Sequence, residues 1–104
     1  MAMIKFVQVA DAKTRYTSEL SERFNLKTIT VNEEYIISLE ENTGLFHSFQ
    51  RGELPDNPIF AKTQRFTSIT IAEGNTINKV NVVGSEDDIR EQINRENRKQ
   101  LLKG

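Results

Sequence analysis

The last third of the chain most constrains the fold, because a hairpin pattern there runs directly into a helix signal. Apolar and polar residues alternate over residues 69–71 and again over residues 80–82, on either side of a turn at Gly74-Asn75. Strict alternation places every second side chain on one face of a strand. The pattern therefore predicts an antiparallel hairpin with one buried face. The predicted register sets Ile69 opposite Val82 and Ile71 opposite Val80, centred on Asn75-Thr76.

A helix signal follows at Ser85, which is a preferred N-cap residue, and Asp88 completes an acidic form of the capping box. Acidic residues fill the first turn and basic residues gather near the C-terminal end, an arrangement that the helix dipole favours. The apolar stripe is narrow, because Ile89 and Ile93 are followed by a polar gap that ends at Leu101-Leu102. The first half of this helix is therefore predicted to pack and the second half to project.

Further strands are predicted upstream, where β-branched and aromatic residues gather. Residues 4–9 form an opening strand, and residues 26–31 and 35–40 flank a turn at residues 32–34. Residues 17–24 fit either a short helix or an extended segment. The strands at 26–31 and 35–40 are predicted to pair with each other, Ile29 opposite Ile37 and Val31 opposite Tyr35, with Leu39 on the same face.

Together these elements predict an α+β fold, with a small antiparallel β-sheet or partly open β-barrel of five or six strands and a C-terminal helix at residues 85–102. Residues 1–104 fit a single domain, because a chain of this length has room for one core. Residues 42–65 hold both prolines and are predicted to be an insertion or loop region. Hydrophobic residues make up 37% of the chain, which predicts a thin core, long polar loops, or burial completed by a partner subunit.

The order of these signals along the chain follows a known pattern. The chain opens with Ile4-Lys5-Phe6-Val7-Gln8-Val9, continues with Ile29-Thr30-Val31-Asn32 and a nearby Ile36 or Ile37, and then has Thr67-Ser68-Ile69-Thr70-Ile71 and the stretch from Val80 to Ile89. This order resembles the small β proteins of the FlbD/SwrD type, linked to flagellar regulation, and related short bacterial and phage proteins. The resemblance implies a hairpin series that leads into a helix, and it implies no catalytic residues.

The composition offers little for catalysis. His47 is the single histidine and there is no cysteine, so a catalytic dyad or a zinc site lacks the residue types it needs. The acidic groups at residues 33–34, 40–41 and 86–88 are explained by solvated strand ends and helix capping, and they lack the spacing of a calcium loop. We therefore expect a protein that is not an enzyme and has no cofactor and no metal site.

The charge balance and the apolar runs restrict the cellular setting. The net charge is −1, whereas a dedicated duplex-binding domain usually carries a basic excess. No apolar run reaches the length of a membrane span, and the start of the chain is not typical of a signal peptide. The absence of cysteine favours a cytosolic setting. We expect a cytoplasmic protein without membrane association.

Residues 45–49 are predicted to form a strand with bulky side chains on both faces, Phe46 on one face and Phe49 on the other. Such a strand is usually covered by another element or by a partner. Two explanations stay open: the Pro-containing loop folds over the segment, or the segment is a surface for a protein partner. The candidate partner-binding residues are Leu45, Phe46, His47, Phe49 and Arg51.

The preferred function is a non-enzymatic protein–protein interaction module, such as a phage-type or bacterial regulator that binds and modulates a host protein. A homodimer is also expected, because one self-complementary patch would bury both copies of the aromatic segment and of Leu101-Leu102. The alternative function is nucleic-acid or small-anion (nucleotide) binding. Its candidate residues are Arg51, Lys62, Arg65, Arg95, Arg98 and Lys99.

Overall fold

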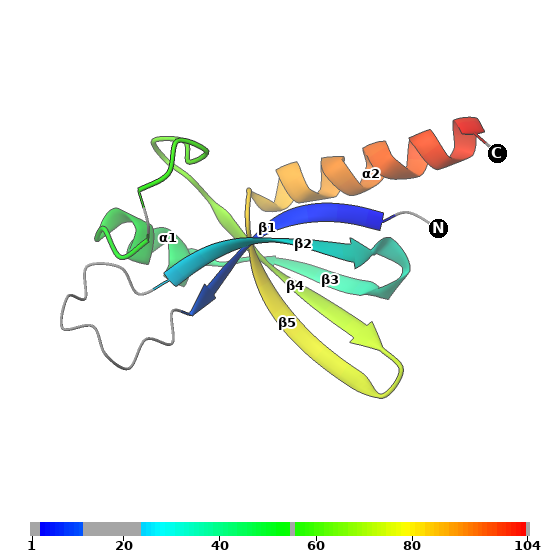
Figure 1. Ribbon diagram of the computed structural model, residues 1–104, viewed down its shortest axis with the longest axis horizontal. Helices are drawn as coiled ribbons and strands as arrows, with labels where there is room; N and C mark the ends of the chain where they lie inside the picture. Colours follow the sequence, from blue (N-terminus) through cyan, green and yellow to red (C-terminus); the bar gives the residue numbers. More distant parts are fainter. Residues whose placement is uncertain (1–2, 12–23, 55, 104) are drawn as a thin grey trace.

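A computed structural model of the chain describes residues 3–11, 24–54 and 56–103, without the side chains of residues 11 and 99–103 (Figure 1). Its elements in chain order are β1 (Met3–Asp11), β2 (Phe24–Asn32), the 3₁₀ turn η1 (Glu33–Tyr35), β3 (Ile36–Glu41), α1 (Thr43–Gln50), β4 (Phe66–Glu73), β5 (Thr76–Val83) and α2 (Glu86–Lys103). The predicted element at residues 17–24 lies outside the described residues, apart from Phe24, which begins β2.

The five strands form one antiparallel sheet in the order β2-β1-β5-β4-β3, which confirms the predicted α+β fold with a C-terminal helix. The sheet is not closed into a barrel, because β2 and β3 are its two edges and do not pair with each other. Among the described strands, β1 and β5 share the single register pair Gln8–Val82. The sheet therefore consists of a β1–β2 hairpin and a β3–β4–β5 unit that meet along a short seam.

The connection through η1 forces this sheet to curve. In a flat sheet of five strands the two edges would lie about 19 Å apart, because neighbouring strands are about 4.8 Å apart. Asn32 and Ile36 flank η1 and are four residues apart in sequence. Even a fully extended chain reaches at most about 14 Å over four residues. The two edges therefore converge where η1 joins them. The Asn32 side chain holds the turn by accepting a hydrogen bond from the backbone N–H of Glu34 at 3.0 Å.

The predicted hairpin between residues 26–31 and 35–40 is wrong. Both segments are strands, but β2 pairs with β1, and β3 pairs with β4. Their apolar patterns are compatible with either pairing, since each strand only requires an apolar neighbour on the same face. The observed partners across β1–β2 are Phe6 for Ile29 and Ile4 for Val31.

The final hairpin is present, with a register two residues away from the predicted one. Ile69 lies opposite Val80, and the tight turn at Gly74-Asn75 joins the strands. Gly74 has a φ of +61°, which glycine adopts without the penalty that a Cβ brings. Because side chains alternate with a period of two, a shift by two residues leaves the same side chains on the buried face.

The predicted strand at residues 45–49 is also wrong, because this segment lies in the helix α1. Asn42 is its N-cap, and the Asn42 Oδ1 accepts a hydrogen bond from the backbone N–H of Leu45 at 3.0 Å. Residues four apart share one face of a helix, so Leu45 and Phe49 lie together. Both belong to the same apolar cluster, and Phe46 is not a member of it. The predicted loop region 42–65 thus begins with a helix and continues as a loop.

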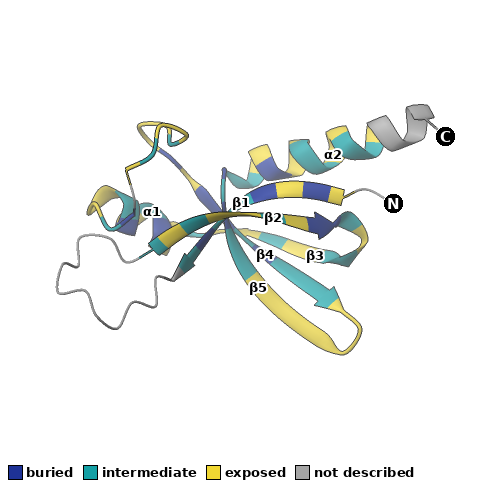
Figure 2. Cartoon of the chain, viewed as in Figure 1, coloured by how far each residue is buried: buried dark blue, intermediate teal, exposed yellow. Residues whose placement is uncertain are grey.

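Each face of the sheet carries its own apolar cluster, because alternate residues of one strand point to opposite faces. The first cluster packs beneath α2, and the second packs beneath α1 and the loop after it, so the two helices cover different parts of the sheet (Figures 1 and 2). The buried members of the first cluster are Ile4, Phe6, Val31, Ile69, Val82 and Ile89. Those of the second are Val9, Leu45, Leu54 and Phe66.

The capping box predicted at the start of α2 is confirmed. The backbone N–H of Asp88 donates to the Ser85 Oγ at 3.1 Å, and the backbone N–H of Ser85 donates to the Asp88 Oδ2 at 3.3 Å. The two bonds satisfy N–H groups that the helix leaves without partners.

Loss of this cap is expected to weaken the protein measurably. Ser85→Ala should lower the free energy of unfolding by about 1 kcal/mol, as for other N-cap serines, in urea denaturation. Ser38→Ala, at an exposed position of β3, serves as the control and should change it by less than about 0.5 kcal/mol. Equal effects of the two substitutions would contradict a role of Ser85 in holding α2.

Candidate functional site

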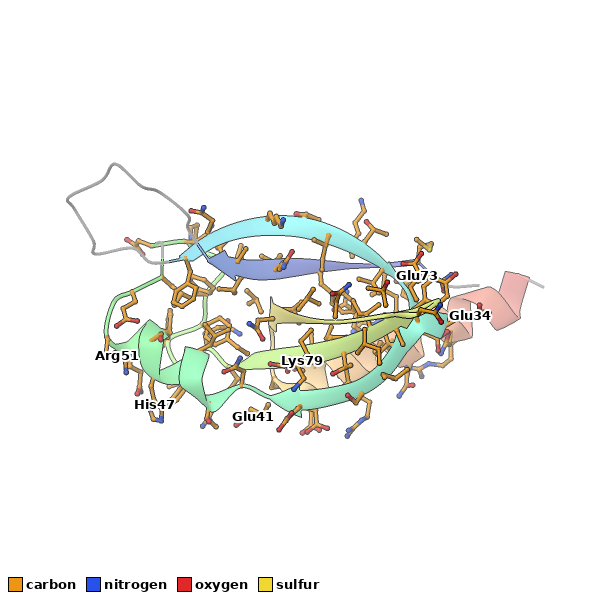
Figure 3. All side chains as sticks on the ribbon, turned by 90° about the horizontal axis from the view of Figure 1, so that it is seen from below. Glu34, Glu41, His47, Arg51, Glu73 and Lys79 are labelled. Atoms are coloured by element: carbon orange, nitrogen blue, oxygen red, sulfur yellow. The ribbon has the colours of Figure 1, made fainter. Side chains whose placement is uncertain are left out.

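Most of the candidate partner-binding segment lies in α1, and its side chains are shared between a buried face and an outer face of this helix. Leu45 is buried, and Phe49 packs with it in the second cluster, where Leu54 and Phe60 from the following loop cover them. This arrangement is the one in which the Pro-containing loop folds over the segment within the same chain. Figure 3 shows the labelled His47 and Arg51 at the outer surface of this part of the molecule.

The outer face of α1 carries a small group of aromatic and charged side chains. The guanidinium carbon of Arg65 lies 4.3 Å from the centroid of the Phe46 ring, a cation–π distance. The Phe46 and His47 ring centroids are 5.6 Å apart. The Arg65 Nη1 also donates to the Glu41 Oε2 at 3.4 Å. Three of the candidate residues, Phe46, His47 and Arg65, are therefore brought together.

Arg51 caps the end of α1 and is held by a carboxylate. Its Nε donates to the Glu53 Oε2 at 2.9 Å and its Nη2 to the Ser48 Oγ at 3.2 Å. The hydrogen bond to Glu53, followed by charge attraction to the same carboxylate, raises the pKa of Arg51 above its ordinary value. The Arg51 side chain is 58% exposed and that of Glu53 is 20% exposed, so water screens the pair mainly from the Arg51 side.

The candidate basic residues do not form one continuous surface. Arg51, Lys62 and Arg65 belong to α1 and the loop that follows it, whereas Arg95 and Arg98 belong to α2 (Figure 1). Arg95 faces Glu91 at 3.6 Å on the same helix. The side chain of Lys99 lies outside the described residues, as do those of Leu101 and Leu102, so the predicted homodimer stays a prediction.

Sequence reasoning missed a groove of about 260 Å³ between β3 and α2, lined by both apolar and polar residues. Four aliphatic side chains line it, and Glu33 and Arg90 add charge. The Glu33 Oε1 accepts a hydrogen bond from the Asn97 Nδ2 at 3.2 Å, which ties η1 to α2 beside the groove. The aliphatic lining residues are Ile36, Ile37, Leu39 and Ile93.

Ile37 is an exposed member of this groove, with 59% of its surface accessible. The prediction that Ile37 shares a buried face with Leu39 is wrong, because the pairing of β3 with β4 shifts register between Ile36 and Ser38. Such a bulge adds one residue to a strand and breaks its alternation. No turn residue in this stretch signals the bulge, so the exposure of Ile37 could not be predicted from local patterns.

Within the described residues, no group of three or more His, Asp or Glu side chains is arranged to hold a metal ion. No helix in the described part of the chain is long and apolar enough to cross a membrane. No protein-family model, no curated protein and no solved structure matches this chain.

Proposed function

We propose that the protein is a non-enzymatic module that binds an extended segment of a partner protein along the free edge of β3. The observation that carries this proposal is the groove of mixed polar and apolar lining beside an edge strand, with Ile37 59% exposed at its rim. An edge strand offers unpaired backbone N–H and C=O groups to an added strand. In such complexes the backbone bonds give affinity, and pockets for alternate side chains give specificity.

The groove adds the specificity that the strand edge lacks. An aliphatic side chain of the added segment would contact Ile36, Leu39 and Ile93, while Arg90 and Glu33 flank it. Arg90 already pairs with Glu86 and lies 3.7 Å from Asp87 on the same helix. The partner segment is therefore expected to be apolar where it enters the groove, since Arg90 already has acidic neighbours. The role we propose for this module is that of a phage-type or bacterial regulator that modulates a host protein.

The alternative function, nucleic-acid binding through the basic residues, has weaker support. Arg51 and Arg65 each face a carboxylate, of Glu53 and Glu41 respectively. A phosphate would have to compete with these neighbours. The second group of candidate arginines lies on α2, away from the first.

The test compares two exposed isoleucines on strands of the same sheet. Ile37→Asp places a charge at the groove, and Ile77→Asp places the same charge on β5, where Ile77 is 67% exposed. In pull-downs from a host lysate, the wild-type chain and Ile77→Asp should retain the same stoichiometric partner, and Ile37→Asp should lose most of it, by about tenfold or more in affinity.

Hydrogen exchange on the isolated complex then locates the contact. Binding should slow the exchange of β3 amides and leave those of β2, the opposite edge, unchanged. Retention of the partner by Ile37→Asp, or protection confined to α1, would contradict this site. If the only species found is a second copy of the chain, sedimentation at several concentrations will show it, and the proposed partner class is then wrong.

A further inference from the structure

Acidic side chains lie at both ends of the β3 edge. Glu33 and Glu34 of η1 precede the strand, and Glu40 and Glu41 end it. Figure 3 shows the labelled Glu34 and Glu41 at opposite ends of β3. The exposed Ile37 and the groove beside α2 lie between these two acidic ends. The charge along the edge therefore restricts which partner segment it accepts.

A third acidic residue lies at the η1 end. β3 and β4 are antiparallel, with Ile36 opposite Ile71, so the residues before Ile36 lie beside the residues after Ile71. Glu73 is the last residue of β4 and therefore lies near η1. Figure 3 shows the labelled Glu73 and Glu34 at this same end of the molecule. Both residues are exposed, so a bound segment can reach their carboxylates.

Basic neighbours do not neutralise the acids at the η1 end. Among the described residues, no ion pair joins Glu33, Glu34 or Glu73 to a lysine or an arginine. Glu33 accepts a hydrogen bond from the side chain of Asn97, which is neutral. Arg90 is the basic residue of the groove, and it already pairs with acidic residues of its own helix. The η1 end therefore carries an excess of negative charge.

The acids at the other end of β3 are partly compensated. The Arg65 Nη1 lies 3.4 Å from the Glu41 Oε2, and the Lys79 Nζ lies 3.9 Å from the Glu40 Oε2. The second pair is long and its side chains are largely exposed, 64% for Lys79 and 73% for Glu40, so it is weak. The negative charge along the edge is therefore greatest at the η1 end.

This charge distribution disfavours a second copy of the chain as the occupant of the edge. If β3 paired with β3 of another copy about a two-fold axis, the strands would be antiparallel. The end that holds Glu34 in one copy would then lie against the end that holds Glu40 in the other. Like charges on neighbouring strands destabilise the pair. A basic segment is attracted by the same side chains.

We propose that the partner segment bound along β3 is basic, with one aliphatic residue in the groove and Lys or Arg residues at the η1 end. This inference rests on the proposed function, since it names the partner chemistry for the same edge. Glu34 is three residues from Ile37 in sequence, a span of at most about 11 Å in an extended chain. The basic residues of the partner are therefore expected three or four positions from its aliphatic residue.

Three synthetic peptides with blocked ends serve as probes, and they differ only in the charge of their ends. The basic probe is Lys-Lys-Thr-Thr-Val-Thr-Thr-Lys-Lys, which places lysines three and four positions from the valine in either strand direction. The neutral probe has glutamine and the acidic probe has glutamate in place of the four lysines. Each probe is titrated into the full chain at low salt, and binding is followed by backbone amide chemical shifts.

The basic probe should shift the β3 amides and bind about tenfold more tightly than the neutral probe, and the acidic probe should bind most weakly. Added salt should reduce this preference, since it screens exposed charges. Glu34→Gln should weaken binding of the basic probe by about threefold and leave that of the neutral probe unchanged. Glu73→Gln should act in the same direction from β4.

The matched control is Glu91→Gln, which makes the same change at an exposed residue of α2 that does not line the groove. It should change the affinity for the basic probe by less than about 1.5-fold. An equal loss in Glu34→Gln and Glu91→Gln would show a general charge effect and overturn the inference. Glu34→Gln keeps the backbone N–H that donates to the Asn32 side chain, so the turn at η1 is retained.

The remaining outcomes separate this inference from the proposed function. If the basic and neutral probes bind β3 equally and Ile37→Asp abolishes both, the edge accepts extended segments without a charge preference, and only the basic partner is wrong. If no probe shifts the β3 amides at millimolar concentration, the proposed function fails together with this inference. Shifts of β3 that depend on protein concentration without any probe would identify a second copy as the occupant and overturn the inference.

Discussion

Phe66→Ala is expected to lower the free energy of unfolding by about 3–5 kcal/mol, the largest effect of any substitution considered for this chain. Phe66 is the largest fully buried side chain among the described residues, with 0% exposed. Its ring lies 5.9 Å from that of Phe49 and 6.0 Å from that of Phe60, with both pairs close to edge-to-face. Removing this ring leaves a cavity between α1, the loop and the sheet, and it removes two favourable aromatic contacts.

The matched control for this substitution is Phe46→Ala, on the outer face of α1. Phe46 is only partly buried, and its contacts are the cation–π contact with Arg65 and the neighbouring ring of His47. Its loss should change stability by about 1 kcal/mol. Urea denaturation followed by circular dichroism measures both values. Similar effects of the two substitutions would mean that the faces of α1 have been assigned wrongly.

Ile69→Ala is expected to lower the free energy of unfolding by about 2–5 kcal/mol. Ile69 is 0% exposed and belongs to the cluster beneath α2, on the opposite face of the sheet from Phe66. A shorter side chain leaves a cavity beside Val82 and Ile89, because the strands on both sides of β4 restrict how far the sheet can collapse.

Ile77→Ala provides the comparison for Ile69→Ala, since Ile77 lies in the paired strand with 67% of its surface exposed. It should change stability by less than about 0.5 kcal/mol. Figure 2 shows this part of β5 as exposed. If Ile69→Ala cost as little as Ile77→Ala, the cluster beneath α2 would not be a packed core.

Local sequence signals were sufficient to predict the elements of the C-terminal part of the fold. The β4–β5 hairpin and α2 depend on neighbours in sequence: a glycine turn, an alternation and a capping box. The error of two residues in the hairpin register arose because a period of two does not distinguish registers that differ by two. The confirmed cap at Ser85 depends on residues only three apart.

The partners of β2 and β3 depend on distant residues, and this is why they were not predicted. A turn at residues 32–34 is compatible with a hairpin, but the chain uses η1 to pass from one edge of the sheet to the other. The helix α1 was missed for a related reason, since Asn42 and Gly44 suit a turn as well as a helix start. The bulge that exposes Ile37 depends in the same way on the pairing of β3 with β4, which are far apart in sequence. The hydrogen bonds from Asn42 and Ser68 to Asn81 also join distant residues.

The short seam between β1 and β5 has a consequence for how the molecule unfolds. By backbone hydrogen bonding alone, the β1–β2 hairpin would be the first unit to open, since one register pair joins it to the rest of the sheet. Its side chains oppose this, because Ile4, Phe6 and Val31 complete the cluster that contains Ile69 and Val82. Opening the hairpin would expose that whole cluster to water. We therefore expect the two parts of the sheet to unfold in one cooperative transition, because apolar burial joins them where a continuous hydrogen-bonded ladder does not.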